Sequence, residues 1–345
     1  MLTVYMLEQS EKWDTVVRSF GQYDVYWLSG YVKAFQLHGD GVPMLFYYED
    51  ENVRGINVVM KRDVADDVHF KGELPKGEYY DFSSPYGYGG WLIEGNESGR
   101  LFSSYEAWCV ENGIISEFVR FHPVIANHIF SESCYEVIGL GNTVALDITS
   151  PKVIWDNLTS KNRNMVCKAQ KNGIRIYNGR NPEIFEEFRM IYNSTMDKDS
   201  ANEYYYFGEE FYRSICEDLA QQAQVFYAVK EEKIIAASIL LAANGRMNYH
   251  LSGSLQEYGN LAPTNLLLYE AALWGSANGC KTLYLGGGVG SGEDNLFKFK
   301  KSFYRLDDLK RFYIGKKIWN RERYDGLLEK RREIQNSGFF PGYRA

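Results

Sequence analysis

The sequence predicts an α/β protein of two tandem domains, each with a mixed central sheet. Three observations lead to this prediction. Short apolar runs typical of strands alternate with longer segments whose apolar residues recur at helical spacing. Two hairpin-like stretches of similar style stand at 43–62 and 224–242. Each is followed by a helical segment that ends at a glycine and then by another strand-like run, which indicates a duplicated unit.

The second half has the clearer order of elements. Its expected elements are strand 173–178, a helix after Pro182, helix 208–219, strands 223–230, 233–242 and 247–252, helix 264–279, strand 282–287, helix 295–303 and strand 309–315. Gly279 stands where a helix C-cap is expected. This β-α-α-β-β-β-α-β-α-β order is that of the GNAT acyltransferase fold.

The first half is a fainter copy of this order. Its expected elements are strand 2–7, helices 11–20 and 30–38, the hairpin 43–62, helix 95–113, strand 114–122 and a final strand 143–148. The boundary between the copies is expected near Thr149-Ser150-Pro151. We therefore expect a GNAT-like domain over 1–149 and a second one over 150–345 that carries a C-terminal helix.

The composition is that of an ordinary globular chain, with 45% hydrophobic and 24% charged residues among 345. No stretch approaches the roughly 20 apolar residues of a membrane span, and the start MLTVYMLEQSEKWD lacks the features of a secretory signal. The five cysteines are scattered, which indicates reduced thiols. We expect a cytoplasmic protein without a transmembrane segment, and the dispersed His and Cys give no reason to expect a metal site.

The net charge of −7 is unevenly distributed along the chain. Residues 160–180 hold six Lys or Arg and no acid, and residues 298–332 hold 13 Lys or Arg against five acids. Such asymmetry is typical of a protein with a phosphate-rich partner, although solvated helix faces explain it equally well. The candidates for phosphate or tRNA contacts in the first segment are Lys161, Arg163 and Lys168.

An acyl-transfer site of the GNAT kind needs no covalent nucleophile, because the acceptor amine attacks the donor carbonyl directly. The protein supplies positioning, a route for the amine proton and donors for the developing oxyanion. The fold places its donor at the N-terminus of the helix that follows the third strand of the meander, here at Thr264 and Asn265. The alternative is that Pro263 and Thr264 only start a helix. The glycine-rich stretch 285–292 does not match a dinucleotide loop.

An ordered set of motifs over about 160–303 resembles the C-terminal domain of the FemABX transferases. The set comprises a basic R-x-x-x-x-K-A-x-K-x-G helix, a T-M-x-K segment with aromatic residues, a G-S-x-x-x-Y turn, a helix with A-x-x-x-G, a strand that ends in Gly-Gly, and F-K-K-x-F. In the first half, YYDFSSPYGYGG at 79–90 looks like a segment of FemAB-like proteins from bacterial polysaccharide loci.

The resemblance implies transfer of an aminoacyl or acyl group to an amine of a cell-wall or surface-glycan precursor. The donor in peptidoglycan-building members is aminoacyl-tRNA, and an acyl-CoA is the alternative donor here. No tightly bound cofactor and no DNA partner are expected. The chain has no long heptad arm between its domains, unlike the larger members.

The resemblance also implies a cleft at one or both domains. The segment FKFKK is expected to bring a lysine to this cleft, where an ammonium group could hold a phosphate or stabilise an oxyanion. The motif match favours Lys301 for catalysis and leaves Lys298 and Lys300 as donor contacts, and a solvated helix is the alternative. Asp294 and Glu293 precede this helix and are candidates to accept the amine proton, although acidic loop residues are usually only solvated.

The candidates for acceptor binding come from both halves. The resemblance assigns this role to Lys198, Tyr205 and Tyr206, and more weakly to Lys33, while Tyr249 is a further candidate from its strand. The loop 79–90 makes a poor core strand because of its Pro and Gly, and its Asp81, Ser83, Ser84, Tyr86 and Tyr88 are candidate sugar or peptide contacts. A structural turn is the alternative. Arg120, on an otherwise apolar strand, must find a partner.

Two other functions remain open from the sequence. The duplicated scaffold could bind a glycan or nucleotide-sugar without catalysis, because fold alone does not determine function. RNA binding without transfer is the third hypothesis, which the local basic segments favour and the overall acidity disfavours.

Overall fold

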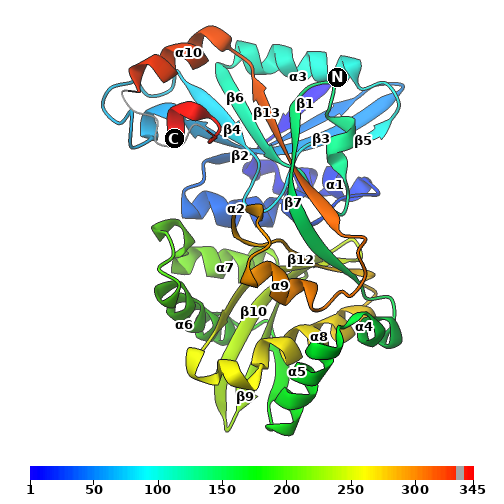
Figure 1. Cartoon of the computed structure of the whole chain (residues 1–345). Coiled ribbons are helices and arrows are strands. Elements are labelled where there is room, and N and C mark those ends of the chain that lie inside the picture. Colours follow the sequence, from blue (N-terminus) through cyan, green and yellow to red (C-terminus); the bar gives the residue numbers. More distant parts are fainter. Residues whose placement is uncertain (332–337) are drawn as a thin grey trace. The chain divides into compact units, whose positions relative to one another are not determined.

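The computed structural model describes residues 1–331 and 338–345, which form two compact units (Figure 1). The first unit comprises 1–140 and 312–345, and the second comprises 141–311. Both units contain a sheet and covering helices, so the predicted α/β class with mixed sheets is confirmed.

The sheet of the first unit has the strand order β1-β2-β3-β4-β6-β13, with β5 paired to β3 beside it. Its strands are β1 (Leu2–Tyr5), β2 (Val42–Glu49), β3 (Val53–Asp63), β4 (Tyr80–Ser83), β5 (Leu92–Gly95), β6 (Ile114–Arg120) and β13 (Lys310–Ile318). Its helices are α1 (Ser10–Ser19), α2 (Ser29–His38), α3 (Gly99–Glu111) and α10 (Arg321–Lys330). The β4 and β6 strands are parallel, and the other pairs in this sheet are antiparallel.

The core of the first unit is unusually aromatic. On α3, Leu101, Phe102, Tyr105 and Cys109 are buried, which is the helical spacing that places side chains on one face. They pack with sheet residues such as Phe46, whose ring lies 4.9 Å from that of Tyr105. Tyr105 therefore serves packing in this core.

The sheet of the second unit has the strand order β7-β12-β11-β10-β9-β8. Its strands are β7 (Glu136–Asp147), β8 (Arg175–Gly179), β9 (Ala223–Lys230), β10 (Lys233–Ala243), β11 (Arg246–Ser254) and β12 (Thr282–Gly286). Its helices are α4 (Pro151–Asn157), α5 (Ser160–Lys171), α6 (Pro182–Lys198), α7 (Glu209–Asp218), α8 (Pro263–Ala277) and α9 (Asn295–Lys301). The β11 and β12 strands are parallel.

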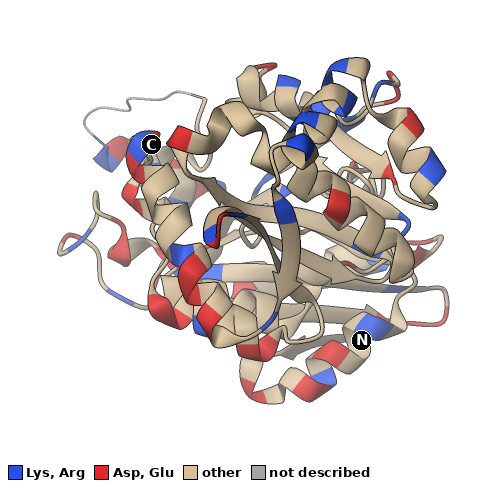
Figure 2. Ribbon diagram, turned by 90° about the horizontal axis from the view of Figure 1, so that it is seen from below, with Lys and Arg blue, Asp and Glu red and all other residues tan. Residues whose placement is uncertain are grey.

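Helices cover both faces of the second sheet, with α5 and α8 on one side and α6 and α7 on the other (Figure 1). Two helix ends follow the sequence closely: Thr159 caps α5 by accepting a hydrogen bond from the backbone of Asn162, and Gly279 takes a left-handed conformation after α8. In Figure 2 the charged residues lie mainly on helices and connections, while the strands are largely uncharged, as expected for a sheet buried on both faces.

The strand partners of β7 and β13 differ from the predicted domain ranges. The final strand expected for the first domain, 143–148, lies in β7, which pairs with β12 in the second unit at Leu146↔Leu283. The last strand expected for the second domain lies in β13, which pairs with β6 in the first unit at Gly315↔Val119. Strand propensity is local, whereas the choice of partner is not, so the sequence pattern could not give these pairings.

Residues 80–83 form a strand where the sequence favoured a contact loop. The β4 strand lies between β3 and β6, and both Asp81 and Phe82 are fully buried in it. The Pro and Gly of segment 79–90 favoured a loop, but they lie after Ser83. The buried carboxylate of Asp81 is neutralised by two arginine partners, and the loop begins only after Ser83.

Candidate functional site

The parallel strands β11 and β12 separate partway along their length. They pair from Arg246↔Thr282 to Asn248↔Tyr284, and β11 then continues to Ser254 without further pairing to β12. At the same place His250 is an extra residue in β11, because Ile239 of β10 pairs with Leu251 while Leu240 pairs with Tyr249. Such bulges bend a strand and recur beside active sites. Ligands of open α/β sheets bind at the carboxyl ends of parallel strands, which is where these two strands part.

Lys300 of α9 is buried beside this separation, with 8% of its surface exposed. Its Nζ donates a 2.7 Å hydrogen bond to the carbonyl of Gly287, just after β12, and lies 5.9 Å from the ring centre of Tyr249 on β11. Burial lowers the pKa of Lys300 to about 8, partly offset by the charge of Asp294. Among the described residues no carboxylate lies within ion-pairing distance of this ammonium group.

The side of the separation formed by β11 carries a small group of hydroxyls. Tyr249 hydrogen-bonds with Ser252 and Ser238, and the two serine oxygens lie 2.8 Å apart. Burial raises the pKa of Tyr249, so its hydroxyl stays protonated near neutral pH. Ser238 was missed in the sequence because it stands in the apolar run of β10, where a lone serine gives no signal without its cross-strand partner.

The other lysines of FKFKK face different surroundings. Lys301, at the end of α9, donates to the carbonyl oxygens of Tyr304 and Leu306 and lies 3.3 Å from Asp307. Lys298 is exposed. The structure therefore brings Lys300, rather than Lys301, to the separation of the strands.

The two acids before α9 also differ. Asp294 is the N-cap of α9: its carboxylate accepts hydrogen bonds from the backbone of Phe297 at 2.8 Å and of Val289 at 3.0 Å. These bonds lower its pKa, which makes it a weak base. Glu293 is exposed in the preceding loop. Asp294 thus serves the loop geometry, and it holds the glycine-rich segment against α9.

The N-terminus of α8 has the features expected of an anion site. No side chain caps it, so backbone N–H groups of its first turn remain available. Asn265 donates a 2.8 Å hydrogen bond to Asn162 of α5, and the amide nitrogen of the buried Asn162 has no partner among the described residues. Thr264 stands beside Asn265 and is half-buried. On the same α5 helix, Lys161 and Lys168 are exposed and Arg163 is half-buried.

The acceptor candidates of the second unit lie on its surface. Lys198 ends α6 and pairs with Asp199 at 3.2 Å. Tyr206 donates a 2.8 Å hydrogen bond to Asp197, and Tyr205 is exposed beside it. These residues form a short aromatic segment between α6 and α7, and its role in binding stays a prediction.

The candidates of the first unit divide into a structural and a loop group. Asp81 accepts from Arg62 at 2.7 Å, Arg344 at 2.6 Å and Tyr343 at 2.9 Å, and the charges of the two arginines hold its pKa low despite burial. It is therefore a buried network centre. Ser84 is buried too, and its Oγ accepts from the backbone of Arg120.

The loop that follows β4 is built from stacked rings. Tyr86 stacks on Phe35 of α2 at 5.2 Å, and Tyr88 lies edge-on to Tyr26 at 5.3 Å. The partners of Arg120 are the carbonyl of Gly87 at 2.9 Å and the ring of Phe312 at 4.9 Å. Lys33 is exposed on α2. Tyr86 and Tyr88 keep part of their surface accessible, and their role as contacts stays a prediction.

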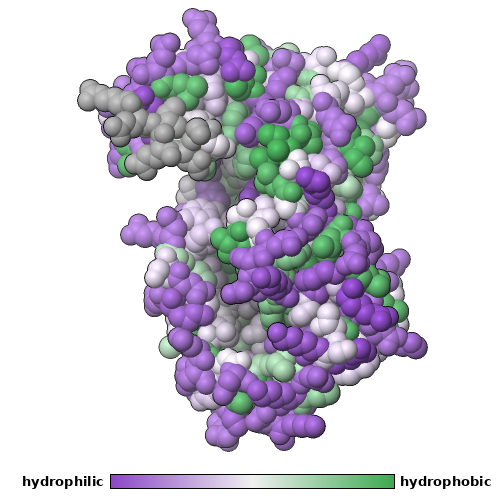
Figure 3. Space-filling view, viewed as in Figure 1, coloured by the Kyte–Doolittle hydropathy of each residue, from purple (hydrophilic) through white to green (hydrophobic). Residues whose placement is uncertain are grey.

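Within 1–331 and 338–345, no group of three or more His, Cys, Asp or Glu side chains is arranged to hold a metal ion. No helix in the same residues has the length and apolar content needed to cross a bilayer. On the face shown in Figure 3, hydrophilic residues dominate and hydrophobic ones are interspersed among them.

Comparisons with known proteins identify one domain and a shared fold. Residues 164–301 match the family model described as an acetyltransferase (GNAT) domain. A search of curated proteins gives no match. Among solved structures, FemX shares 14% sequence identity, with a TM-score of 0.66 over 94% of this chain and 98% of that chain.

Two further structures have similar folds. L-PGS from Bacillus licheniformis shares 15% identity and has a TM-score of 0.58 over 93% of this chain and 95% of that chain. A tandem GNAT protein from the clavulanic acid biosynthesis pathway shares 9% identity and has a TM-score of 0.51 over 93% and 99% of the two chains. The resemblance is therefore confirmed at the level of the fold: the chain has a FemX-like fold, and residues 164–301 match a GNAT acetyltransferase domain.

Proposed function

We propose that the chain is an N-acyltransferase that moves an aminoacyl or acyl group to an amine of a cell-wall or surface-polysaccharide precursor. The acceptor amine attacks the donor carbonyl directly, so that an amide bond forms, the thioester or ester bond of the donor breaks, and the CoA thiol or tRNA hydroxyl leaves with a proton. No acyl-enzyme forms. The observation that carries this proposal is the buried ammonium group of Lys300 where β11 and β12 separate. The GNAT domain match supports acyl transfer, and the similarity to FemX supports the choice of acceptor class.

Lys300 is suited to stabilise the oxyanion that develops on the donor carbonyl. Of its three N–H groups, one binds Gly287, and the others have no protein acceptor among the described residues. A charge held in a partly desolvated site acts more strongly than one in water. Tyr249 on β11, protonated and fixed by two serines, supplies a neutral hydrogen-bond donor on the other side of the separation between β11 and β12.

The donor is proposed to bind with its phosphates at the N-terminus of α8. The uncapped backbone N–H groups, with Thr264 and Asn265, favour an anion there. The cations of α5 are then contacts for the remaining phosphates, whether of an acyl-CoA or of a charged tRNA. Glu293 remains the candidate for accepting the amine proton, because Asp294 is committed to capping α9.

The test combines donors, acceptors and two neighbouring lysine variants. The purified chain is incubated with acetyl-CoA, longer acyl-CoAs or charged tRNA, each with a UDP-linked muropeptide or nucleotide-linked amino sugars, and the products are weighed by mass spectrometry. Lys300→Met should lower kcat by about 100-fold or more, as expected for a lost oxyanion donor. Lys301→Met should keep most activity because its ammonium binds backbone oxygens.

The result that would reject the proposal is turnover by Lys300→Met at the level of the unchanged chain. Absence of turnover with every donor, together with tight binding of a glycan or nucleotide-sugar, would favour the binding-protein alternative. The aromatic loop with Tyr86 and Tyr88 is the observation that supports this second function.

A further inference from the structure

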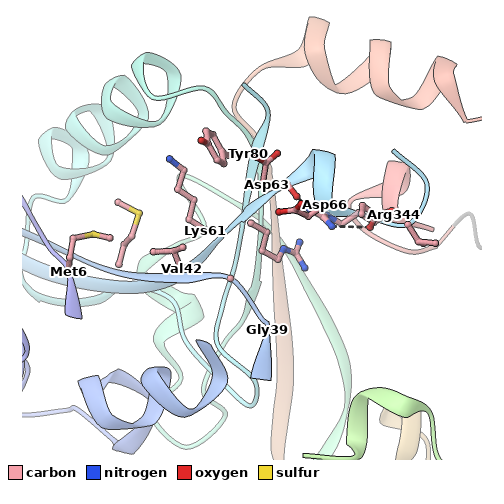
Figure 4. A pocket seen from close by; sticks show the side chains of 13 residues that line it. Met6, Gly39, Val42, Lys61, Asp63, Asp66, Tyr80 and Arg344 are labelled. Atoms are coloured by element: carbon pink, nitrogen blue, oxygen red, sulfur yellow. Dashed lines mark hydrogen bonds and ion pairs between the residues drawn. The ribbon is translucent and has the colours of Figure 1, made fainter. Parts of the chain in front are cut away.

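The first unit contains a pocket that the proposed acyl transfer does not use. Its volume is about 630 Å³, within the range of small-molecule sites. Its lining comes from the residue after β1, the turn after α2, the first residues of β2, the end of β3 and the segment after it, the first residue of β4, and the C-terminal tail. Figure 4 shows this pocket, whereas Lys300 belongs to the second unit.

The side chain of Lys61 is the unusual feature of this pocket. Its Nζ lies 3.6 Å from the ring centre of Tyr80, and within the described residues no carboxylate or carbonyl oxygen accepts a hydrogen bond from it. Burial lowers the pKa of Lys61, while Asp63 raises it. A partly desolvated ammonium group with unused donors is costly unless an acceptor reaches it, and an anion is the acceptor that would stabilise it most.

The other charges of the pocket are already paired. Asp63 accepts from the backbone of Ala65 and Gly77 through its two oxygens. Asp66 pairs with Lys76 at 2.6 Å, and Asp67 pairs with Arg344 at 2.9 Å. Arg62, the next residue along β3, is drawn to the buried Asp81. Lys61 is therefore the cation left to bind a ligand.

Apolar side chains lie beside Lys61. Met6, Val42 and Met44 line the pocket together with Tyr80. Figure 4 places Met6, Val42, Lys61 and Tyr80 on one side, and Asp66 with Arg344 on the other. Methionine side chains adapt to varied apolar shapes, so this side suits an aliphatic chain.

We propose that this pocket binds a monoanionic amphiphile, with its carboxylate on Lys61 and its aliphatic chain against Met6, Val42 and Met44. The charge of the lining favours one negative charge over two, because three cations and three carboxylates line the pocket together. A phosphate dianion would meet the three aspartates, whereas a carboxylate is satisfied by the single free ammonium group.

Two sources provide such a ligand: a free fatty acid, and the C-terminal carboxylate of a peptide that ends in an aliphatic residue. Octanoate and N-acetylleucine are the corresponding probes. Titration calorimetry on the full chain should detect binding of the better probe, and octylammonium, with the same chain and the opposite charge, should bind at least tenfold more weakly. The stronger of the two carboxylates identifies the source.

The variant Lys61→Met keeps the apolar stem and removes the charge, and it should weaken carboxylate binding at least tenfold. Lys71→Met is the matched control, because Lys71 is exposed and does not line the pocket. Val42 is 43% exposed, so its substitution is compatible with folding. Val42→Lys should tighten carboxylate binding and Val42→Glu should weaken it.

Three results would overturn the proposal: unchanged binding in Lys61→Met, equal binding of octylammonium, or tighter binding of inorganic phosphate than of either carboxylate. The same titrations on Lys300→Met should match the unchanged chain. This comparison separates the pocket from the acyl-transfer site, so failure of one proposal leaves the other to be judged alone.

Discussion

Two adjacent lysines in α9 differ in their surroundings and therefore in the role that each can have. Lys300 is buried against Gly287 and has a pKa near 8, while Lys301 binds the turn that follows the helix. The sequence motif favoured Lys301. A seven-residue helix with lysines at three of its last four positions does not by itself reveal which lysine points inward. The end of β12 identifies Lys300 as the inward lysine, because Gly287 just after this strand accepts its hydrogen bond.

The lowered pKa of Lys300 predicts a pH dependence of acyl transfer. The ammonium form is the one that stabilises an oxyanion, so this contribution is complete below pH 8 and is lost as the pH rises through about 8. A plot of kcat/KM against pH should show a descending limb near that value. Lys301→Met should retain the limb, whereas Lys300→Met should lack it, and a limb in both variants would assign it to another group.

Glu117 gives the core of the first unit its own pH response. It is fully buried on β6, accepts from Tyr105 at 3.0 Å and Asn57 at 3.2 Å, and burial raises its pKa to about 7. The folded state therefore keeps a proton that the unfolded chain loses at about pH 4.5. Stability should fall as pH rises from about 4.5 to 7, by on the order of 3 kcal/mol, and then level off.

Replacing Glu117 with Gln should remove this fall, because the amide has no proton to lose. The measurement is urea unfolding at pH 5.5 and pH 8, followed by the signal of the buried tryptophans. Glu106→Gln, on the exposed side of α3, is the control and should keep the pH difference of the unchanged chain. An undiminished difference in Glu117→Gln would show that another group causes it.

At the scale of elements, the sequence predicted most helices and strands of both units. Alternating or continuous apolar runs gave β9 and β10, and the stripe after Pro182 gave α6, because these patterns reflect burial of one face. The β4 strand was missed for a physical reason. Its buried Asp81 is neutralised by Arg62 and Arg344, and Arg344 is 263 residues away, beyond any local pattern.

The close approach of α6 to β11 depends on one glycine. A Cβ on Gly253 would lie 2.7 Å from the carbonyl oxygen of Ile191 and 2.8 Å from the Cα of Tyr192. We expect Gly253→Ala to push the helix from the sheet and to destabilise the second unit by about 1–3 kcal/mol. Gly259→Ala, with no atom within 4 Å of its Cβ, should be close to neutral. Thermal unfolding of both variants tests the difference.

At the scale of the whole molecule, the sequence indicated a duplicated unit. It did not indicate that β7 pairs in the second unit and β13 in the first. The second unit needs β7, which comes before the predicted boundary, and the first unit needs β13, from the far end of the chain. Site prediction stopped at a similar limit. The helix N-terminus of α8 was recognisable from Pro263 and its neighbours. The cluster of hydroxyls around Tyr249 could be recognised only from the register of β10 against β11.

The pairing of β7 with β12 predicts how fragments of the chain behave. A fragment of residues 141–311 retains five strands of the second unit whole, together with the part of β7 that pairs with β12. It should fold cooperatively, as judged by circular dichroism and a single thermal transition. A fragment of residues 150–345 lacks β7 and leaves the edge of β12 open, so it should aggregate or unfold at lower temperature. Equal stability of the two fragments would contradict the pairing.

The boundaries of the two units also set the order in which the chain can mature on a ribosome. The second unit is inserted between 140 and 312 of the first, so its last residue is synthesised before the first unit receives β13, Tyr343 and Arg344. Until then, the carboxylate of Asp81 lacks one of its two arginine partners. The part of the chain made first is thus the part completed last, and the inner domain can fold while the outer one still waits for its closing strand.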